Sequence, residues 1–507
     1  MKFNLINNSN ISNTSVSKSR LTIFFTEAIC MILELCSSYL FYPYFGNTNT
    51  IWISIITVIL LSNCLGNIIG GHICKKYYAG TEKKNYSGTT FFLIATAIIL
   101  ILTFTDPVIF LVNKIPISND FKALLSSLLL FLPCNILLGT IPPQVMFKET
   151  TEENYNAEKT GIVYALSTMG GLFGSVIGGF FLVPYIGCKY IIIICSIIAL
   201  IFGFFYTPQF WKKTTNIICL LTVAGIIFST ATYKAPDWEN EDYSSITIDS
   251  QYNRIILQNT IENGEKIRDM IMESGYESAT YLDKDKRNEL IFEYFQKVND
   301  TILENKDIKS DKMLMIGGAA YQFPKFVISH YSDAYLDVVE LDPKVTELAK
   351  QYFFLQDCID EFDPNNERLG LYNDDGREFL KKSSERYDII FNDAFSGNLP
   401  IATLSSVEFA KIVKTRLSPN GLYVVNIIDT REGNPERFLL SEAKTLSTVF
   451  KNIHIIECHP DRADNQEQNL ILIATDGNYN FDNATNMDFS KGLMLTDDYC
   501  PVEHLSK

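Results

Sequence analysis

Residues 313–323 read MLMIGGAAYQF, and this stretch decides how the rest of the chain is interpreted. Apolar, β-favouring residues lead directly into Gly317-Gly318, which predicts a strand followed by a tight turn. Strand-to-glycine turns are typical of nucleotide sites, because glycine lets the backbone approach the ligand closely. The further glycines and the acid that such turns often carry are absent here. Three interpretations therefore stay open: a working nucleotide turn, one that has lost its charge, or an ordinary turn.

The chain divides into an apolar half and a charged half. It has 507 residues, 47% hydrophobic and 13% aromatic, which is too long for one ordinary domain. Before about residue 233, long stretches are almost uncharged and near the ~20 residues that cross a bilayer. The first stretch is too long for a cleavable signal, and it follows a polar tail. The expected spans are 21–45, 50–74, 90–113, 123–147, 161–186, 189–207 and 215–233.

Lysines and arginines set the expected orientation. They gather before the first span and after the second, fourth and sixth spans, so the positive-inside rule predicts a cytoplasmic N-terminus in a multi-pass protein of the inner membrane. Seven spans would place the charged half outside the cell. Six spans would leave it in the cytoplasm, and the sequence leaves both options open.

The membrane half offers little chemistry. Residues 164–179, YALSTMGGLFGSVIGG, are rich in small residues, which favours close helix packing over a substrate path. Glu27 and Glu34 are the main ionisable groups within the spans, and Glu34 is the better polar candidate.

Charge and metal-binding residue types exclude several functions. The net charge of -15 argues against a nucleic-acid partner. The eleven cysteines and five histidines are scattered without metal-ligand or disulfide spacing, so no metal site is expected.

The charged half alternates strands and helices. The expected strands are 246–257 (as a hairpin-rich start), 312–317, 334–341, 369–374, 387–393, 421–428, 452–458 and 469–475. Helical patterns fill most of the gaps, which predicts a mainly parallel sheet covered on both faces. Ligands of such sheets bind outside the carboxyl ends of the strands.

The residues at those strand ends form a series. Gly317-Gly318 ends the first parallel strand, Glu340 the second, and Asp393 the fourth, while the third runs into Asp375-Gly376. A carboxylate at Glu340 suits the two hydroxyls of a ribose, and Asp375-Gly376 suits an adenine edge. Each acid can also simply cap the following helix.

The order IGG, VELDP, DDGREFL and YDIIFNDAFSG resembles the spermidine and spermine synthases, the polyamine aminopropyltransferases. The membrane half resembles the bacterial branch in which this domain is fused to several spans. The resemblance implies an α-helical membrane domain joined to a Rossmann-like, class I methyltransferase-like α/β domain with a small β-hairpin region. The expected domains are a polar tail (1–20), a membrane domain (21–233), a β-rich region (234–305) and a nucleotide-binding domain (306–507).

The resemblance also implies roles. Asp393 would accept a proton from the amine substrate, Glu340 would bind the ribose, and Asp375 the adenine of decarboxylated S-adenosylmethionine, a co-substrate used without a metal. Asn253 and Tyr294 match substrate-side positions of the family only in part.

Two departures from the family pattern concern acids. Ala320 stands where the family has the aspartate that meets the aminopropyl ammonium, and Ser396 replaces a second aspartate beside the catalytic strand. Nucleoside binding is expected to survive these changes, whereas polyamine recognition depends on acids from elsewhere, such as Glu277.

Three functions follow from these residues. The first is a membrane-bound aminopropyltransferase that acts on a polyamine or related amine. The second is a methyltransferase that uses S-adenosylmethionine, and the third is a non-catalytic membrane protein that senses polyamines or nucleosides. The expected partners are a nucleoside sulfonium, an amine and the lipid bilayer, with a homo-oligomer as one possible assembly.

Overall fold

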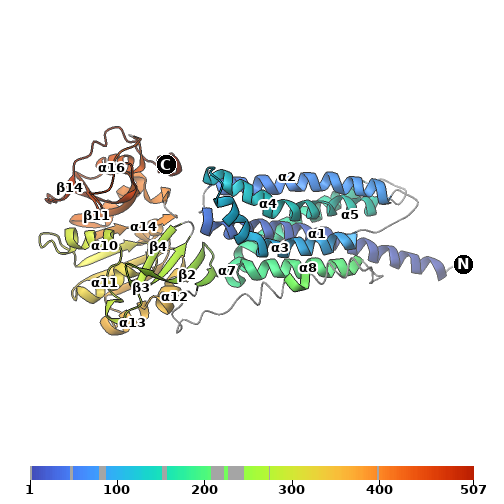
Figure 1. Cartoon of the computed structure of the whole chain (residues 1–507), viewed down its shortest axis with the longest axis horizontal. Helices are drawn as coiled ribbons and strands as arrows, with labels where there is room; N and C mark the ends of the chain where they lie inside the picture. Colours follow the sequence, from blue (N-terminus) through green and yellow to red (C-terminus); the bar gives the residue numbers. More distant parts are fainter. Residues whose placement is uncertain are drawn as a thin grey trace. The chain divides into compact units, whose positions relative to one another are not determined.

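The structure is a computed structural model of the whole chain (Figure 1), and it describes residues 3–45, 49–78, 87–150, 157–206, 222–225, 245–272, 275–396, 399–434 and 436–506. The chain forms two compact units. The helical unit comprises Met1–Pro236 and Ile248–Arg254, and the α/β unit comprises Asp237–Thr247 and Ile255–Lys507. Each unit is described by itself below.

Among the residues that the structure describes, six helices of the helical unit are long and apolar enough to cross a membrane. They cover Lys18–Phe41, Ile51–Lys76, Gly88–Asn113, Asp120–Phe147, Ala157–Leu182 and Cys188–Tyr206. The expected seventh span, 215–233, lies outside the described residues except for the helical residues 222–225. The helical elements are α1 (Phe3–Phe45), α2 (Asn49–Ile73), η1 (Cys74–Tyr78), α3 (Ser87–Asn113), α4 (Asn119–Gly139), α5 (Ile141–Thr150), α6 (Ala157–Ile177), η2 (Gly178–Leu182), α7 (Val183–Ile186) and α8 (Cys188–Tyr206).

Small residues hold α6 against α1, as the glycine-rich sequence predicts. A methyl group added at Gly170 would collide with the carbonyl oxygen of Phe24, and one at Gly174 would lie 2.5 Å from the carbonyl oxygen of Ala28. These glycines therefore allow the two backbones to touch, which is how helices associate where no hydrophobic force distinguishes protein from lipid.

After the apolar helices, the chain forms a four-stranded sheet in the order β1-β2-β3-β4. Its strands are β1 (Ser245–Asp249), β2 (Arg254–Glu262), β3 (Glu265–Met272) and β4 (Gly275–Tyr281). The turn Asn263-Gly264 joins β2 to β3 with positive φ at both residues, +52° and +84°. Positive φ at both residues is the conformation that a two-residue hairpin turn requires, and asparagine and glycine adopt it more easily than other residues.

The large sheet has eight strands in the order β14-β12-β13-β11-β8-β5-β6-β7. Strands β7, β6, β5, β8 and β11 are parallel, and β13 runs antiparallel between β11 and β12. The strands are β5 (Lys312–Ile316), β6 (Tyr335–Glu340), β7 (Leu369–Asn373), β8 (Tyr387–Asn392), β11 (Leu417–Asp429), β12 (Asn452–Glu457), β13 (Gln468–Thr475) and β14 (Ala484–Thr485). The short strands β9 (Phe395–Ser396) and β10 (Leu399–Pro400) form a separate pair.

Strand β5 shows how the sheet is buried on both faces. Met313 and Met315 belong to one apolar core, and the alternate residues Leu314 and Ile316 belong to the other. Successive side chains of a strand point to opposite faces, so β5 contributes to two cores at once. The expected Rossmann-like fold and the α-helical domain are both confirmed.

Helices cover both faces of this sheet (Figure 1). The helices of the α/β unit are η3 (Lys284–Lys286), α10 (Glu293–Val298), η4 (Asn299–Leu303), α11 (Gln322–His330), α12 (Pro343–Tyr352), α13 (Leu355–Phe362), α14 (Gly376–Lys382), η5 (Ala402–Leu404), α15 (Val407–Arg416), α16 (Phe438–Ser447) and α17 (Val502–Leu505). The sequence analysis did not predict α13, although its buried residues Leu355, Cys358 and Ile359 recur at helical spacing.

Candidate active site at the carboxyl ends of the strands

The glycine turn lies between β5 and α11 and is fixed by its neighbours on both sides. The Gly317 N–H donates to the carbonyl of Val339 on β6 at 2.9 Å. Gly317 has a φ of +92°, and a Cβ there would lie 2.7 Å from the carbonyl oxygen of Asp393. Glycine is therefore required both for the backbone angle and for the close approach of β8.

The rest of the turn keeps a glycine-like backbone with other residues. Ala319 and Tyr321 have φ values of +44° and +56°, a conformation that costs about 1 kcal/mol or more outside glycine. The Tyr321 ring is fully buried against Gly318, and its hydroxyl lies 2.9 Å from that of Thr346. Ala320 is 0% exposed. The position of the family's aspartate thus offers neither charge nor accessible surface.

Glu340, at the end of β6, is held by backbone donors. Its Oε2 accepts from the N–H groups of Gly318 at 2.8 Å and Ala319 at 3.3 Å, and its Oε1 accepts from Asp342 N–H at 2.9 Å. Burial raises the pKa of Glu340, while these hydrogen bonds oppose that rise. A carboxylate has about four acceptor positions, so one is left beside the turn. A ribose that donates both hydroxyls would have to displace the long Ala319 bond.

Asp375 serves as a helix cap and keeps acceptor capacity. Its Oδ1 accepts from Glu378 N–H at 2.9 Å, at the start of α14. Its Oδ2 makes no hydrogen bond within the described part of the chain. A Cβ on the buried Gly376 would lie 2.5 Å from Cγ2 of Ile316, so glycine lets α14 pack on β5. Capping and adenine binding are therefore compatible at this acid.

Asp393 directly follows β8 and is the centre of a hydrogen-bond chain. Its Oδ2 accepts from the Tyr294 hydroxyl at 3.0 Å, and its Oδ1 accepts from Nδ2 of Asn426 at 2.8 Å. The carbonyl oxygen of Asn426 in turn accepts from Nδ2 of Asn469 at 3.0 Å. Burial raises the pKa of Asp393 to about 7, although both side-chain hydrogen bonds oppose the rise. The carboxylate is thus oriented and able to exchange a proton near neutral pH.

The sequence analysis missed Asn426 and Asn469. Asn426 interrupts the apolar run of β11, and Asn469 begins that of β13. A polar side chain inside a buried strand needs a hydrogen-bond partner, so these two asparagines in apolar strands could have been noticed as candidate site residues. Strand pairing places Asn426 opposite Ile471, so the sequence alone did not bring Asn426 and Asn469 together.

The remaining expected site residues are placed as follows. Tyr294, on α10, reaches Asp393. Ser396 lies in β9, and its side chain, like that of Glu277, is outside the described atoms. Asn253 lies in the turn between β1 and β2, within the segment grouped with the helical unit, so its substrate role stays a prediction. Among the described residues, no group of three or more His, Cys, Asp and Glu side chains could hold a metal ion.

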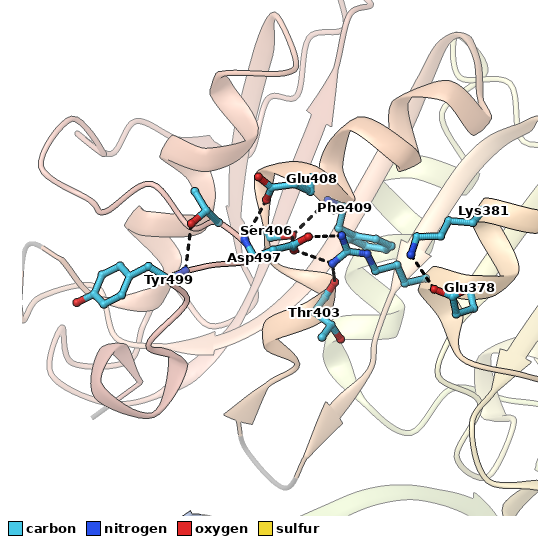
Figure 2. Close-up of polar contacts among 10 residues, drawn as sticks. Glu378, Lys381, Thr403, Ser406, Glu408, Phe409, Asp497 and Tyr499 are labelled. Atoms are coloured by element: carbon cyan, nitrogen blue, oxygen red, sulfur yellow. Dashed lines mark hydrogen bonds and ion pairs between the residues drawn. The ribbon is translucent and has the colours of Figure 1, made fainter.

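A second polar network ties α14 to the C-terminal segment (Figure 2). Arg377 donates to both carboxylate oxygens of Asp497, at 2.7 and 2.6 Å, and to the carbonyl of Thr403. The Ser406 hydroxyl also donates to Asp497 at 2.6 Å. The Arg377 and Ser406 hydrogen bonds lower the pKa of Asp497 to about 2. Arg377 therefore ties α14 both to η5, which follows β10, and to the C-terminal segment that contains Asp497.

Comparison with known proteins finds similarity to the family that the sequence motifs resemble. The Spermine/spermidine synthase domain family matches residues 299–456. A polyamine aminopropyltransferase of Vibrio vulnificus is 28% identical over 212 residues, which cover 41% of this chain and 62% of that protein. Another, from Oceanobacillus iheyensis, is 24% identical over 354 residues, which cover 66% of this chain and 63% of that protein. The chain thus spans a little under two thirds of these curated relatives.

A solved structure, a probable spermidine synthase of Corynebacterium glutamicum, has a TM-score of 0.40 and 22% identity, and covers 48% of this chain and 84% of its own. The Oceanobacillus match covers more of this chain than residues 234–507 contain, so it extends into the helical unit. Residues 299–456 are therefore similar to the Spermine/spermidine synthase domain, and the described residues before them include six long apolar helices.

Proposed function

We propose that this protein is a membrane-bound aminopropyltransferase that transfers an aminopropyl group from decarboxylated S-adenosylmethionine to a polyamine or related amine. The observation that carries the proposal is Asp393. Its side-chain carboxylate is oriented by hydrogen bonds and has a pKa of about 7, and its backbone carbonyl oxygen lies next to Gly317 of the glycine turn. The similar proteins of Vibrio vulnificus and Oceanobacillus iheyensis are polyamine aminopropyltransferases, which supports the same activity.

The donor would lie along the carboxyl ends of β5, β6 and β7. Glu340 would accept a hydrogen bond from the ribose, and Oδ2 of Asp375 would accept one from the adenine amine. The glycines of the turn would let the nucleoside approach the backbone closely. This arrangement would leave the sulfonium and its propyl group on the side of β8, where Asp393 lies.

Asp393 would supply the proton chemistry. A free alkylamine has a pKa of about 10.4 and is almost wholly protonated at neutral pH, so it cannot attack until a base removes a proton. The amine nitrogen would then form a bond to the propyl carbon as the carbon–sulfur bond breaks. The electron pair of that bond goes to sulfur, methylthioadenosine leaves, and the amine proton ends on Asp393.

A second candidate is methyl transfer from S-adenosylmethionine. The buried, uncharged Ala320 favours it, because no acid of the turn would hold the ammonium of an aminopropyl donor. The adenosine contacts would be the same in both reactions. The choice of donor therefore distinguishes the two functions.

The test is calorimetric titration of the full-length protein in detergent with decarboxylated S-adenosylmethionine, S-adenosylmethionine and methylthioadenosine, followed by a putrescine transfer assay. We expect preference for the decarboxylated donor, with product formation that is lost in Asp393→Asn. Asp388→Asn is the matched control, since Asp388 lies on the same strand but bonds Lys312 N–H. Methylation from the carboxylated donor would support the second candidate. Nucleoside binding without turnover of any donor would refute both.

We also propose that the protein lies in the inner membrane with its N-terminus in the cytoplasm. The lysine distribution supports this orientation. A cytoplasmic α/β unit would meet a donor that is made in the cytoplasm. A reporter fused after Lys507 would show on which side of the membrane that unit lies.

A further inference from the structure

A shallow groove of about 120 Å³ lies between the first turns of the α1 span and the last turns of α8. The two helices are joined there by a 2.6 Å hydrogen bond between the hydroxyls of Thr22 and Tyr206. The groove therefore lies at one end of the helical bundle, where the α1 span begins at Lys18 and the α8 span ends. Nothing in the proposed reaction uses this part of the chain.

The groove is apolar along its wall and cationic at its edge. Leu21 and Phe205 on its rim are 53% and 58% exposed, although both are large hydrophobic residues. The Lys18 ammonium lies 5.2 Å from the centroid of the Phe205 ring. A ligand that fits must combine a long apolar part with a group that attracts a cation.

The charge of Lys18 is available to such a ligand. Its side chain is exposed, and no carboxylate of the described residues lies within ion-pair distance of it. The Phe205 ring lies on one side of the ammonium, so its other donors can reach an anion. Aromatic rings and lysines at the ends of spans lie at the depth of lipid headgroups.

We propose that this groove binds one anionic phospholipid of the surrounding bilayer. The phosphate would lie beside Lys18, and one acyl chain would lie along Leu21 and Phe205. A zwitterionic phospholipid offers the same acyl chains, but its own cation competes with Lys18 for the phosphate. The site is therefore selective for net negative charge at the headgroup.

The test is native mass spectrometry of the full-length protein after exchange into mixed phosphatidylglycerol and phosphatidylcholine. We expect selective retention of phosphatidylglycerol and about a five-fold weaker retention in Lys18→Gln, the usual effect of one lysine on an anionic lipid. Lys114→Gln is the matched control: Lys114 also lies over an aromatic ring, Phe110 at 4.1 Å, but does not line this groove. Equal loss in both variants would refute the site.

A second variant separates binding from folding. Leu21→Trp should fill the groove from its exposed rim and remove the retained lipid, while the melting temperature in lipid-free detergent stays within a few degrees of the parent. Lys18→Arg should keep the preference for phosphatidylglycerol, because it keeps the charge. Equal retention of the two phospholipids by the parent protein, or full retention by Leu21→Trp, would overturn the proposal.

Discussion

Replacing Tyr294 with phenylalanine removes one hydrogen bond from the carboxylate of Asp393 and leaves the packing of the ring in place. The bond is 3.0 Å long and is one of the interactions that hold the pKa of Asp393 down to about 7. A hydrogen bond to a charged group contributes about 1.5–3 kcal/mol, which corresponds to roughly one to two pKa units. Its loss should therefore move the pKa of Asp393 to about 8 or above.

The assay is kcat/KM for aminopropyl transfer between pH 6 and 9.5. The base must be ionised, so activity falls as the pH drops through the pKa of Asp393. In Tyr294→Phe the ionised fraction at pH 7 should fall from about one half to about one tenth or less, and kcat/KM by about five-fold or more. At the high-pH plateau the two proteins should agree within about two-fold.

Tyr331→Phe is the matched control, because its hydroxyl bonds Asn299 on η4 rather than the site. Its pH profile should match that of the parent protein. A Tyr294→Phe profile that is lowered equally at every pH, with no shift of the acidic limb, would refute the assignment of Asp393 as the titrating base.

Three further predictions follow from individual side chains. Asp393→Asn should lower the rate of aminopropyl transfer by about 10²- to 10⁴-fold and leave methylthioadenosine binding, measured by calorimetry, unchanged. The same variant should have a higher melting temperature at pH 8 than the parent protein, because the free-energy cost of burying the ionised Asp393 develops as the pH rises from 3.8 toward 7. Gly376→Ala should lower the free energy of unfolding by about 1–3 kcal/mol in thermal unfolding, because the new methyl group would collide with Ile316. Gly161→Ala should not lower it, because no atom apart from the adjoining backbone of its own helix lies within 4 Å of the position that its methyl group would occupy. Lys325 is fully buried, and burial lowers its pKa from 10.5 to about 7, so the parent protein should become more stable as the pH rises between these values. In Lys325→Met the melting temperature should change less between pH 7 and pH 9, and the same pH dependence as in the parent would contradict this reasoning.

The strand-end acids show how far local sequence determines a site. Parallel strands end at one edge of a sheet, so Glu340 and Asp393 were predictable as neighbours of the glycine turn from their order alone. The helix GREFLKK was also predictable, because Asp375 is a favourable cap and Gly376 begins a clear helical run. Their ligand roles stay predictions, since the hydrogen bonds within the described chain explain the capping and the turn by themselves.

The conformation of the glycine turn is set by the elements packed around it. Gly317 is fixed by β6 and β8, and Tyr321 holds a left-handed backbone because its ring is buried beneath Gly318. Such a backbone is unfavourable for tyrosine in an isolated segment, and only surrounding packing stabilises it. The shape of the turn therefore depends on its tertiary contacts, and its role as a nucleotide turn without an acid at Ala320 stays a prediction.

The sequence by itself determined the apolar and charged halves, the alternation of strands and helices, and the acids at the strand ends. These features depend on the period of the hydrophobic residues and on interactions between residues that are close in the chain, so they can be read from short stretches of sequence. Only the tertiary structure decided that Asn426 and Asn469 orient Asp393, that Arg377 holds Asp497, and that Lys18 borders an open groove. The hydrogen bonds among these residues join positions 33 to 120 apart, and such pairings are set by how whole elements pack rather than by any local preference.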